Sequence, residues 1–166
     1  MLTIFAITAC RKDNAIPQNL ISNSSFENNG NPSFQGWTGN LYAFVNNVPA
    51  NGGQWSLQLA PGWVPDEGFA ETFVTGLSGN YIFKLTCDAK TIYWSGGVIL
   101  RLQNQNGITT DLSKTTFNNT TWSTITLTTN ATLQPTDKLI IHLTAGMTEI
   151  PMGKVLFDKV RLEIQY

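Results

Sequence analysis

Residues 81–88 read YIFKLTCD, and this stretch decides the fold. Its apolar residues fall on every second position, which sends Lys84, Thr86 and Asp88 to the opposite face of an extended chain. This alternation predicts a β-strand with one face in a core. Cys87 lies on the apolar face, where a free cysteine packs as a small hydrophobic side chain.

The same alternation recurs along the chain. Longer strands of this kind are expected at residues 98–103, 124–128, 139–144 and 159–164, and shorter strands at residues 19–22, 41–45, 55–59 and 70–74. Turn-forming pairs such as Asn106-Gly107 separate them. Short strands at this spacing, with no helical period between them, predict an all-β fold: a two-sheet antiparallel β-sandwich of the jelly-roll type. Its first and last strands are expected to be neighbours.

Composition and charge narrow the class of protein. The chain has 166 residues, 42% of them hydrophobic and 13% charged, which is typical of one domain with a sizeable core. The formal net charge is -1, so the chain has no basic field with which to displace counterions from a phosphate backbone. Nucleic acid is therefore not expected as a partner.

The amino-terminal residues resemble an export signal. Residues 2–9 form a short apolar run, and the sequence from Ile7 to Cys10 resembles a bacterial lipobox, in which Cys10 is lipidated. The alternative is an ordinary first strand with a buried cysteine. We therefore predict a signal segment at residues 1–10, a tether at 11–18 and a domain at 19–166. The protein is expected at the cell surface or outer membrane, or in the periplasm, and to meet the membrane only through a lipid anchor.

Several motifs, taken in order, resemble those of family 4, 9 and 22 carbohydrate-binding modules. They are Asn19–Glu27 (NLISNSSFE), Gly36–Thr38 (GWT), Ser56-Leu57, Gly76–Phe83 (GLSGNYIF), Lys90, Trp122 and Phe157–Leu162 (FDKVRL). The resemblance spans most of residues 19–166 and rests on the order and spacing of the motifs. It implies a galactose-binding-like β-jelly roll that binds a carbohydrate without catalysis.

The resemblance also implies a structural calcium site. It brings together Glu27 and Asp158, which help to hold the ion in similar modules. Calcium takes six to eight oxygen ligands, so carbonyl groups of residues 51–55 are expected to supplement the two acids. A phase slip between residues 155–157 and 160–162 suggests a bulge that re-aims the Asp158 side chain. The alternative is a surface carboxylate and a turn cap.

Two groups of residues are candidates for contact with a sugar, which needs aromatic faces and fixed hydrogen-bonding groups. Trp63, Tyr93 and Trp94 are aromatic residues in predicted loops, with packing at the rim of the domain as the alternative. Arg101, Gln103 and His142 lie on the outward faces of predicted strands, where a solvated surface is the alternative. The motif residues Trp37 and Trp122 are expected to pack in the structure.

Catalysis has little support in the sequence. His142 is the only histidine, and it lies in an alternating strand with no nucleophile motif nearby. The chain contains carboxylates that fall in no recognisable motif, namely Asp66, Glu67, Glu71, Asp88 and Asp111. We therefore expect a lipid-anchored, non-enzymatic carbohydrate-binding module. A structural or adhesive cell-surface sandwich that contacts another protein is the alternative, and a small glycoside hydrolase or lyase is a third hypothesis.

Overall fold

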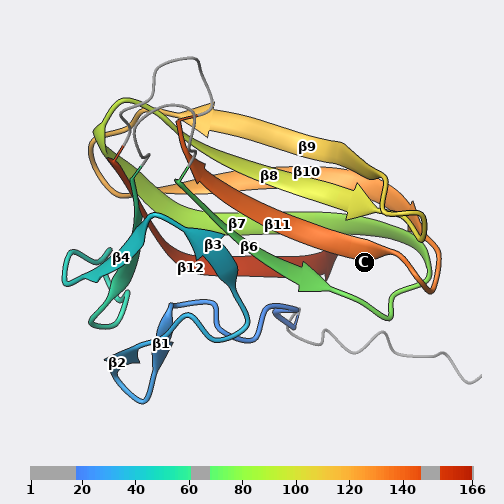
Figure 1. Cartoon of the computed structure of the whole chain (residues 1–166), viewed down its shortest axis with the longest axis horizontal. Helices are drawn as coiled ribbons and strands as arrows, with labels where there is room; N and C mark the ends of the chain where they lie inside the picture. Colours follow the sequence, from blue (N-terminus) through green and yellow to red (C-terminus); the bar gives the residue numbers. More distant parts are fainter. Residues whose placement is uncertain (1–17, 61–67, 147–153, 166) are drawn as a thin grey trace, which may run out of the picture.

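A computed structural model of the chain describes residues 18–60, 68–146 and 154–165. These ranges contain twelve β-strands, and no helix within them is long and apolar enough to cross a membrane. The strands are β1 (Glu27–Asn28), β2 (Asn31–Pro32), β3 (Thr38–Asn40), β4 (Tyr42–Val45), β5 (Ser56–Leu59), β6 (Gly68–Val74), β7 (Gly79–Tyr93), β8 (Gly96–Gln103), β9 (Thr109–Phe117), β10 (Ser123–Leu133), β11 (Lys138–Ala145) and β12 (Lys154–Gln165) (Figure 1).

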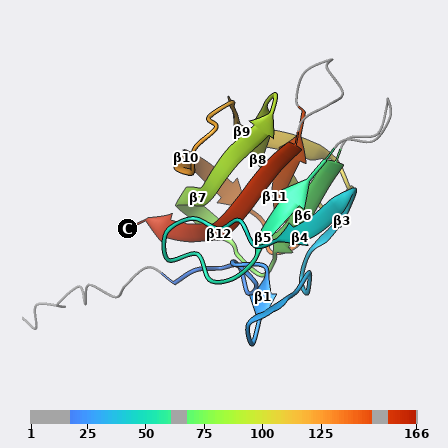
Figure 2. The same ribbon diagram turned by 90° about the vertical axis from the view of Figure 1, so that its left-hand side faces the viewer.

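Ten of these strands form two antiparallel sheets of five. One sheet has the order β10-β7-β12-β5-β4, and the other has the order β3-β6-β11-β8-β9. The two sheets lie face to face (Figures 1 and 2), and β1 pairs with β2 as a small hairpin outside them. The predicted two-sheet antiparallel sandwich is confirmed.

The core lies between the sheets and is built by the alternating residues. Phe83, Leu85 and Cys87 of β7 are at most 1% exposed, and they share one hydrophobic cluster with Leu100 of β8 and Ile141 of β11. Lys84 and the other outward residues of β7 remain partly exposed. Cys87 is buried, as the alternation predicted; its thiol is free, and burial raises its pKa.

The predicted first strand at residues 19–22 is wrong, because no described strand begins before Glu27. The Asn19 side chain takes the place of some backbone hydrogen bonds that a strand would make. Its Oδ1 accepts hydrogen bonds from Ile21 N at 3.1 Å and Leu162 N at 3.0 Å. Leu20 N also donates to Leu162 O at 2.9 Å. Residues 19–22 therefore lie beside the last strand, as predicted. The Asn19 side chain makes part of the hydrogen bonding to that strand, and the backbone of Leu20 makes the other part.

The predicted bulge in the last strand is confirmed. The register between β12 and β7 shifts between Asp158 and Arg161. Lys159 takes a positive φ of 49°, which is costly for a residue with a Cβ. The shift leaves Asp158 fully buried and directs its carboxyl group toward the loop that precedes β5.

Candidate functional site

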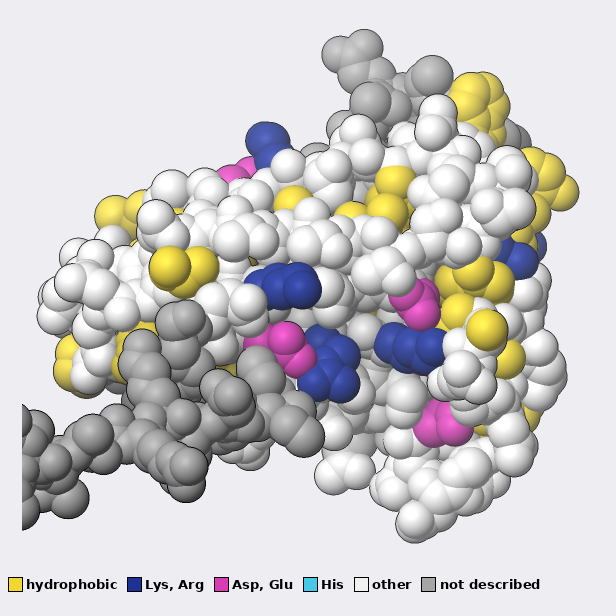
Figure 3. All heavy atoms as spheres, turned by 180° about the vertical axis from the view of Figure 1, so that it is seen from behind, with side chains coloured by type: hydrophobic (Ala, Val, Ile, Leu, Met, Phe, Trp, Pro, Cys, Tyr) yellow, Lys and Arg dark blue, Asp and Glu magenta, His cyan; other side chains and the backbone are white. Residues whose placement is uncertain are grey.

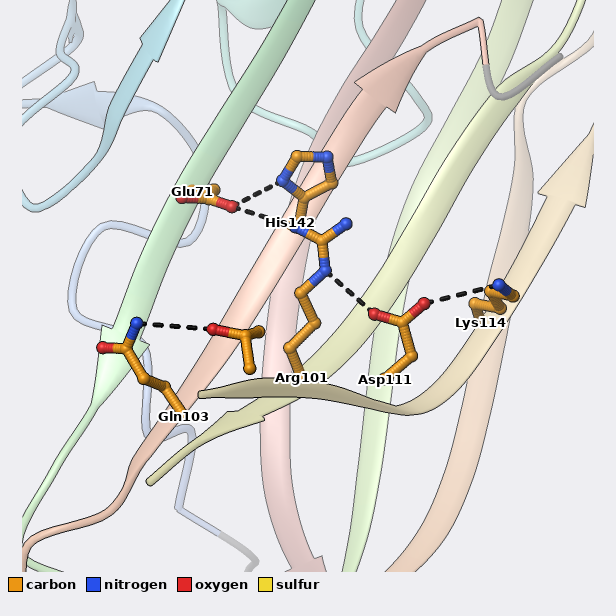
Figure 4. A network of polar contacts seen from close by, with 7 residues as sticks. Glu71, Arg101, Gln103, Asp111, Lys114 and His142 are labelled. Carbon is orange, nitrogen blue, oxygen red and sulfur yellow. Dashed lines mark hydrogen bonds and ion pairs between the residues drawn. The ribbon is translucent and has the colours of Figure 1, made fainter. Parts of the chain in front are cut away.

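The outer face of the β3-β6-β11-β8-β9 sheet carries a group of polar side chains. Strand register sets His142 beside Glu71 of β6, and it sets Arg101 beside Asp111 of β9. Gln103 lies two residues beyond Arg101 and therefore points to the same side of the sheet. The polar face, as we call it, consists of Glu71, Arg101, Gln103, Asp111, Lys114 and His142 (Figure 4).

Charged contacts join four strands across this face. Glu71 Oε1 lies 2.6 Å from His142 Nδ1 and 3.3 Å from Arg101 Nη1. Arg101 Nε donates to Asp111 Oδ1 at 3.1 Å, and Asp111 Oδ2 lies 3.4 Å from Lys114 Nζ. An ionised carboxylate only accepts hydrogen bonds, so the contact with Glu71 places the imidazole proton on Nδ1. The negative charges of Glu71 and Asp111 are thus matched by the positive charges of Arg101 and Lys114. Each of these side chains is held in place by the next one in the network.

Apolar rings border the same face. Phe69 and Phe73 flank Glu71 at alternate positions of β6, so all three side chains point outward. Phe69 stacks on the His142 imidazole with ring centroids 5.6 Å apart. Phe73 is 60% exposed, and Lys138 Nζ lies 5.5 Å from the centre of its ring. An exposed ring beside fixed hydrogen-bonding groups is the combination that a pyranose requires.

A second polar centre lies where the amino-terminal segment meets β12. Glu27 Oε1 accepts hydrogen bonds from Gln54 N and Trp55 N, both at 2.5 Å. A Cβ on Gly53 would lie 2.5 Å from Glu27 Oε1, and a Cβ on Gly52 would lie 2.5 Å from Asp158 Oδ2. Two consecutive glycines therefore let one loop press against both carboxyl groups.

The Asp158 carboxyl group is held in an unfavourable environment. Its Oδ2 is buried and has no hydrogen-bond partner among the described residues, while Oδ1 accepts from Lys159 N at 2.7 Å. Burial, with smaller contributions from the nearby Glu27 and Asp88 carboxylates, raises the pKa of Asp158 to about 7. A buried oxygen without a partner, beside a second carboxylate and closely packed backbone, suits a hard cation. Among the described residues no third Asp, Glu, His or Cys joins the pair, so carbonyl groups or water would supply the remaining ligands.

No family model and no curated protein sequence matches the chain, whereas solved structures do. A family 16 carbohydrate-binding module matches with a TM-score of 0.61 and 19% identity, over 87% of this chain and 99% of that one. The xylan-binding family 22 domain of Xyn10C from Paenibacillus barcinonensis matches with a TM-score of 0.59 and 16% identity, over 89% and 95% of the two chains. TmCBM61, a module in complex with β-1,4-galactotriose, matches with a TM-score of 0.56 and 13% identity, over 89% and 99%.

The chain has the jelly-roll fold of carbohydrate-binding modules. Families 4 and 22, two of the families that the sequence resembles, are among these solved structures. At identities below 20% the likeness is one of fold alone.

The structure brings together only some of the predicted ligand residues. Arg101, Gln103 and His142 share the polar face, as expected from their outward positions. Tyr93 and Trp94 do not join them, because they lie at the crossing from β7 to β8, at the far end of β8 from Gln103. They are 61% and 53% exposed, so neither packs as a buried ring. Trp63 lies outside the described residues, as does Cys10.

The two tryptophans that were expected to pack do so to different degrees. Trp37 is 6% exposed, contacts Phe26 with ring centroids 4.9 Å apart and donates from Nε1 to Asn23 O at 2.8 Å. Trp122 is only partly buried, and Lys90 Nζ lies 5.3 Å from its ring centre. Trp37 is thus a core residue, whereas Trp122 covers the surface of the other sheet.

Sequence reasoning missed Glu71 and Phe73 as members of the site. The signal for them was present: both alternate with Ala70 and Thr72 in a predicted strand and so face outward. What the sequence lacked was the neighbour relation between β6 and β11, which sets Glu71 opposite His142 across about 70 residues of chain.

Proposed function

We propose that the polar face binds a polysaccharide chain without catalysing its cleavage. The observation that carries the proposal is the exposed Phe73 ring beside the fixed network of Glu71, Arg101 and Asp111, on the outer face of a sheet in this fold. The ring offers an apolar platform to one face of a pyranose. Arg101 Nη2 makes no hydrogen bond to a described residue, so it can donate to a sugar hydroxyl.

The network also argues for binding over hydrolysis. A glycosidase needs one carboxylic acid that is free to protonate the leaving oxygen. Glu71 and Asp111 are both held by the Arg101 guanidinium, so neither is presented to a bound chain as a free acid. Their role in the proposal is to hold Arg101 rigid, which lowers the entropy lost when a sugar binds.

The test is electrophoresis through gels that contain xylan, β-glucan or galactan, followed by calorimetry on the polysaccharide that retards the protein. Phe73→Ala and Arg101→Ala are each expected to weaken binding about two- to tenfold, which corresponds to the ~0.5–1.5 kcal/mol of a ring contact or a fixed hydrogen bond. Trp94→Ala is the matched aromatic control and is expected to bind as the unmodified protein does.

Two results contradict the proposal. Loss of binding in Trp94→Ala, with Phe73→Ala and Arg101→Ala unaffected, would move the site to the β7–β8 crossing. The absence of retardation on every polysaccharide would favour the adhesive alternative. That alternative has one observation of its own: Leu41 and Tyr42 are each 42% exposed, and Tyr42 belongs to the edge strand β4.

We propose further that Glu27 and Asp158 hold a structural calcium ion. The buried, unpartnered Oδ2 of Asp158 and its proximity to Glu27 across Gly52 and Gly53 support this site. The ion would neutralise two facing carboxylates and join the start of the domain to its last strand. Calcium, which prefers oxygen ligands, fits this donor set better than zinc does.

We also propose that the protein is exported and is anchored by a lipid on Cys10. The support is the apolar run of residues 2–9 followed by Cys10, with charged residues directly after it. A module held at the cell surface or in the periplasm in this way would keep a polysaccharide close to the membrane.

A further inference from the structure

A hollow of about 580 Å³ lies on the other sheet, away from the polar face. It is formed where β7 begins and where β10 and β12 end. The residues around it are Asn80, Tyr81, Ile82, Asn130, Ala131, Thr132, Ile164 and Gln165. Strand register makes them direct neighbours, since Ile82 pairs with Asn130 on one side and with Gln165 on the other. Its volume falls within the range of ~300–1,000 Å³ that is usual for small-molecule sites.

Among the described residues that line this hollow there is no aspartate, glutamate, lysine, arginine or histidine. Figure 3 shows this side of the molecule, where charged side chains gather over the middle of the sheet and the described surface at its left-hand end is neutral. The chain's carboxyl-terminal end, marked on the right in Figure 1, falls on the left in that view. Arg161 and Glu163, the nearest charged side chains on β12, pair with each other at 2.6 Å.

Three carboxamides supply the hydrogen-bonding groups. Asn80 Oδ1 accepts from Thr132 Oγ1 at 2.6 Å, which fixes the Asn80 amide; its nitrogen makes no hydrogen bond to a described residue and can donate to a ligand. The side chains of Asn130 and Gln165 make no hydrogen bond within the described part of the chain. Each therefore offers a donor and an acceptor to a ligand. Ile82 lies between them and is 45% exposed, a large share for an isoleucine in a sheet.

We propose that this hollow is a second binding site and that its ligand is a neutral saccharide. Each sugar hydroxyl donates one hydrogen bond and accepts others, which matches the paired donor and acceptor of a carboxamide. The C–H face of the ring meets the exposed Ile82 side chain. An anionic sugar would lose hydration here without meeting a cation, so the neutral lining selects against it.

The position of the hollow would let one molecule bind a saccharide at two separate places, which the polar face alone would not allow. The two sites lie on different sheets of one sandwich, so one molecule would hold two polysaccharide strands, or two parts of one strand. Binding at both sites makes the second contact intramolecular and raises the overall avidity without new contacts. The second site does not depend on the polar face, and either can fail alone.

The test is titration of the full chain with xylohexaose, cellohexaose, maltohexaose and β-1,4-galactotriose, followed by nuclear magnetic resonance of side-chain amides. The amides of Asn80, Asn130 and Gln165 report on the hollow, and the amide of Gln103 reports on the polar face. At least one neutral probe is expected to shift the hollow amides saturably. The double variant Asn130→Ala/Gln165→Ala is expected to bind it at least about tenfold more weakly at this site.

Two controls separate the hollow from the polar face. Arg101→Ala is expected to leave the response of the hollow amides intact, and Thr126→Ala, an exposed change elsewhere on β10, is expected to change neither site. If none of the four probes shifts the amide signals of Asn80, Asn130 and Gln165, the second site is excluded, whatever the Gln103 amide shows. Unchanged affinity in the double variant would overturn it as well.

Discussion

At the scale of single residues, Asp158 shows how one buried group ties stability to pH. Burial raises its pKa to about 7, whereas an aspartic acid in an unfolded chain titrates near pH 4. Between these values the metal-free folded protein holds a proton that the unfolded chain has released. The free energy of unfolding of the metal-free protein therefore falls as the pH rises from about 4 to about 7, by at most ~4 kcal/mol.

Calcium should reverse this behaviour. We expect calcium to raise the melting temperature of the protein at pH 7.5 and a chelator to lower it, because the ion replaces the missing partner of Asp158. Asp158→Asn should remove the calcium response and should leave the melting temperature of the chelated protein equal or higher at pH 8. Thermal melting monitored by circular dichroism measures all of these quantities.

Glu163→Gln is the matched control for this prediction, since it removes a carboxylate from the same strand that is already paired with Arg161. It should keep the calcium response. A melting temperature that is the same with calcium and with chelator would exclude the site. A full response in Asp158→Asn would show that the ion binds elsewhere.

At the scale of elements, the short strand β3 depends on a residue without a side chain. A Cβ on Gly39 would overlap the Phe69 carbonyl oxygen of β6, which is backbone and cannot give way. Gly39→Ala is therefore expected to separate β3 from β6 and to lower the free energy of unfolding by ~1–3 kcal/mol. Denaturant unfolding measures the loss, and hydrogen exchange should show lower protection at Phe69 and Ala70.

Thr38→Ala provides the comparison, because this exposed residue of β3 can lose its side chain without entering the β6 backbone. Its stability should change little. Equal stability in Gly39→Ala would mean that β3 can move away from β6 without a cost, and the close approach would then have no structural role.

The elements also show how far sequence reasoning reaches. Period-two alternation located β7, β8, β10, β11 and β12, because one face of each strand is in the core. It missed β9, where Ser113 and Thr115 are partly buried and polar residues hide the alternation. It also took residues 19–22 for a strand, since the apolar Leu20 and Ile21 give no sign that the Asn19 side chain replaces the ladder.

The candidate site was predictable to a similar extent. Alternation placed Arg101, Gln103 and His142 on outward faces, and the structure shows them on one face. It gave no information on which strands are neighbours, because register between distant segments depends on the whole fold. Only the three-dimensional structure therefore shows that Glu71 pairs with His142. Tyr93 and Trp94 were predicted in a loop as ligand contacts, with packing at the rim as the alternative; in the structure Tyr93 ends β7, and neither residue joins the polar face.

At the scale of the whole molecule, the proposed anchor decides where the module acts. Expressed in a bacterium with a lipoprotein pathway, the full chain should incorporate labelled palmitate and sediment with membranes. Cys10→Ser should abolish both, because that thiol is the one the lipobox resemblance marks. Membrane fractionation with fatty-acid labelling is the measurement.

Cys87→Ala serves as the control, since this buried thiol is only 1% exposed in the folded domain. It should remain labelled and membrane-bound. Labelling that persists in Cys10→Ser would contradict the anchor, and so would an unmodified protein found entirely in the soluble fraction.

The hydrogen bonds between Asn19 and the last strand have a mechanical meaning. Any pull applied to the chain ahead of Asn19 reaches β12 first, through the contacts of Asn19 and Leu20 with Leu162 and of Ser24 with Val160. β12 is bonded along most of its length to β7, in the interior of its sheet. The load therefore enters at a strand that is hydrogen-bonded on both sides and not at an edge strand, so a pull on the chain ahead of Asn19 would not strip the sheet from its edge.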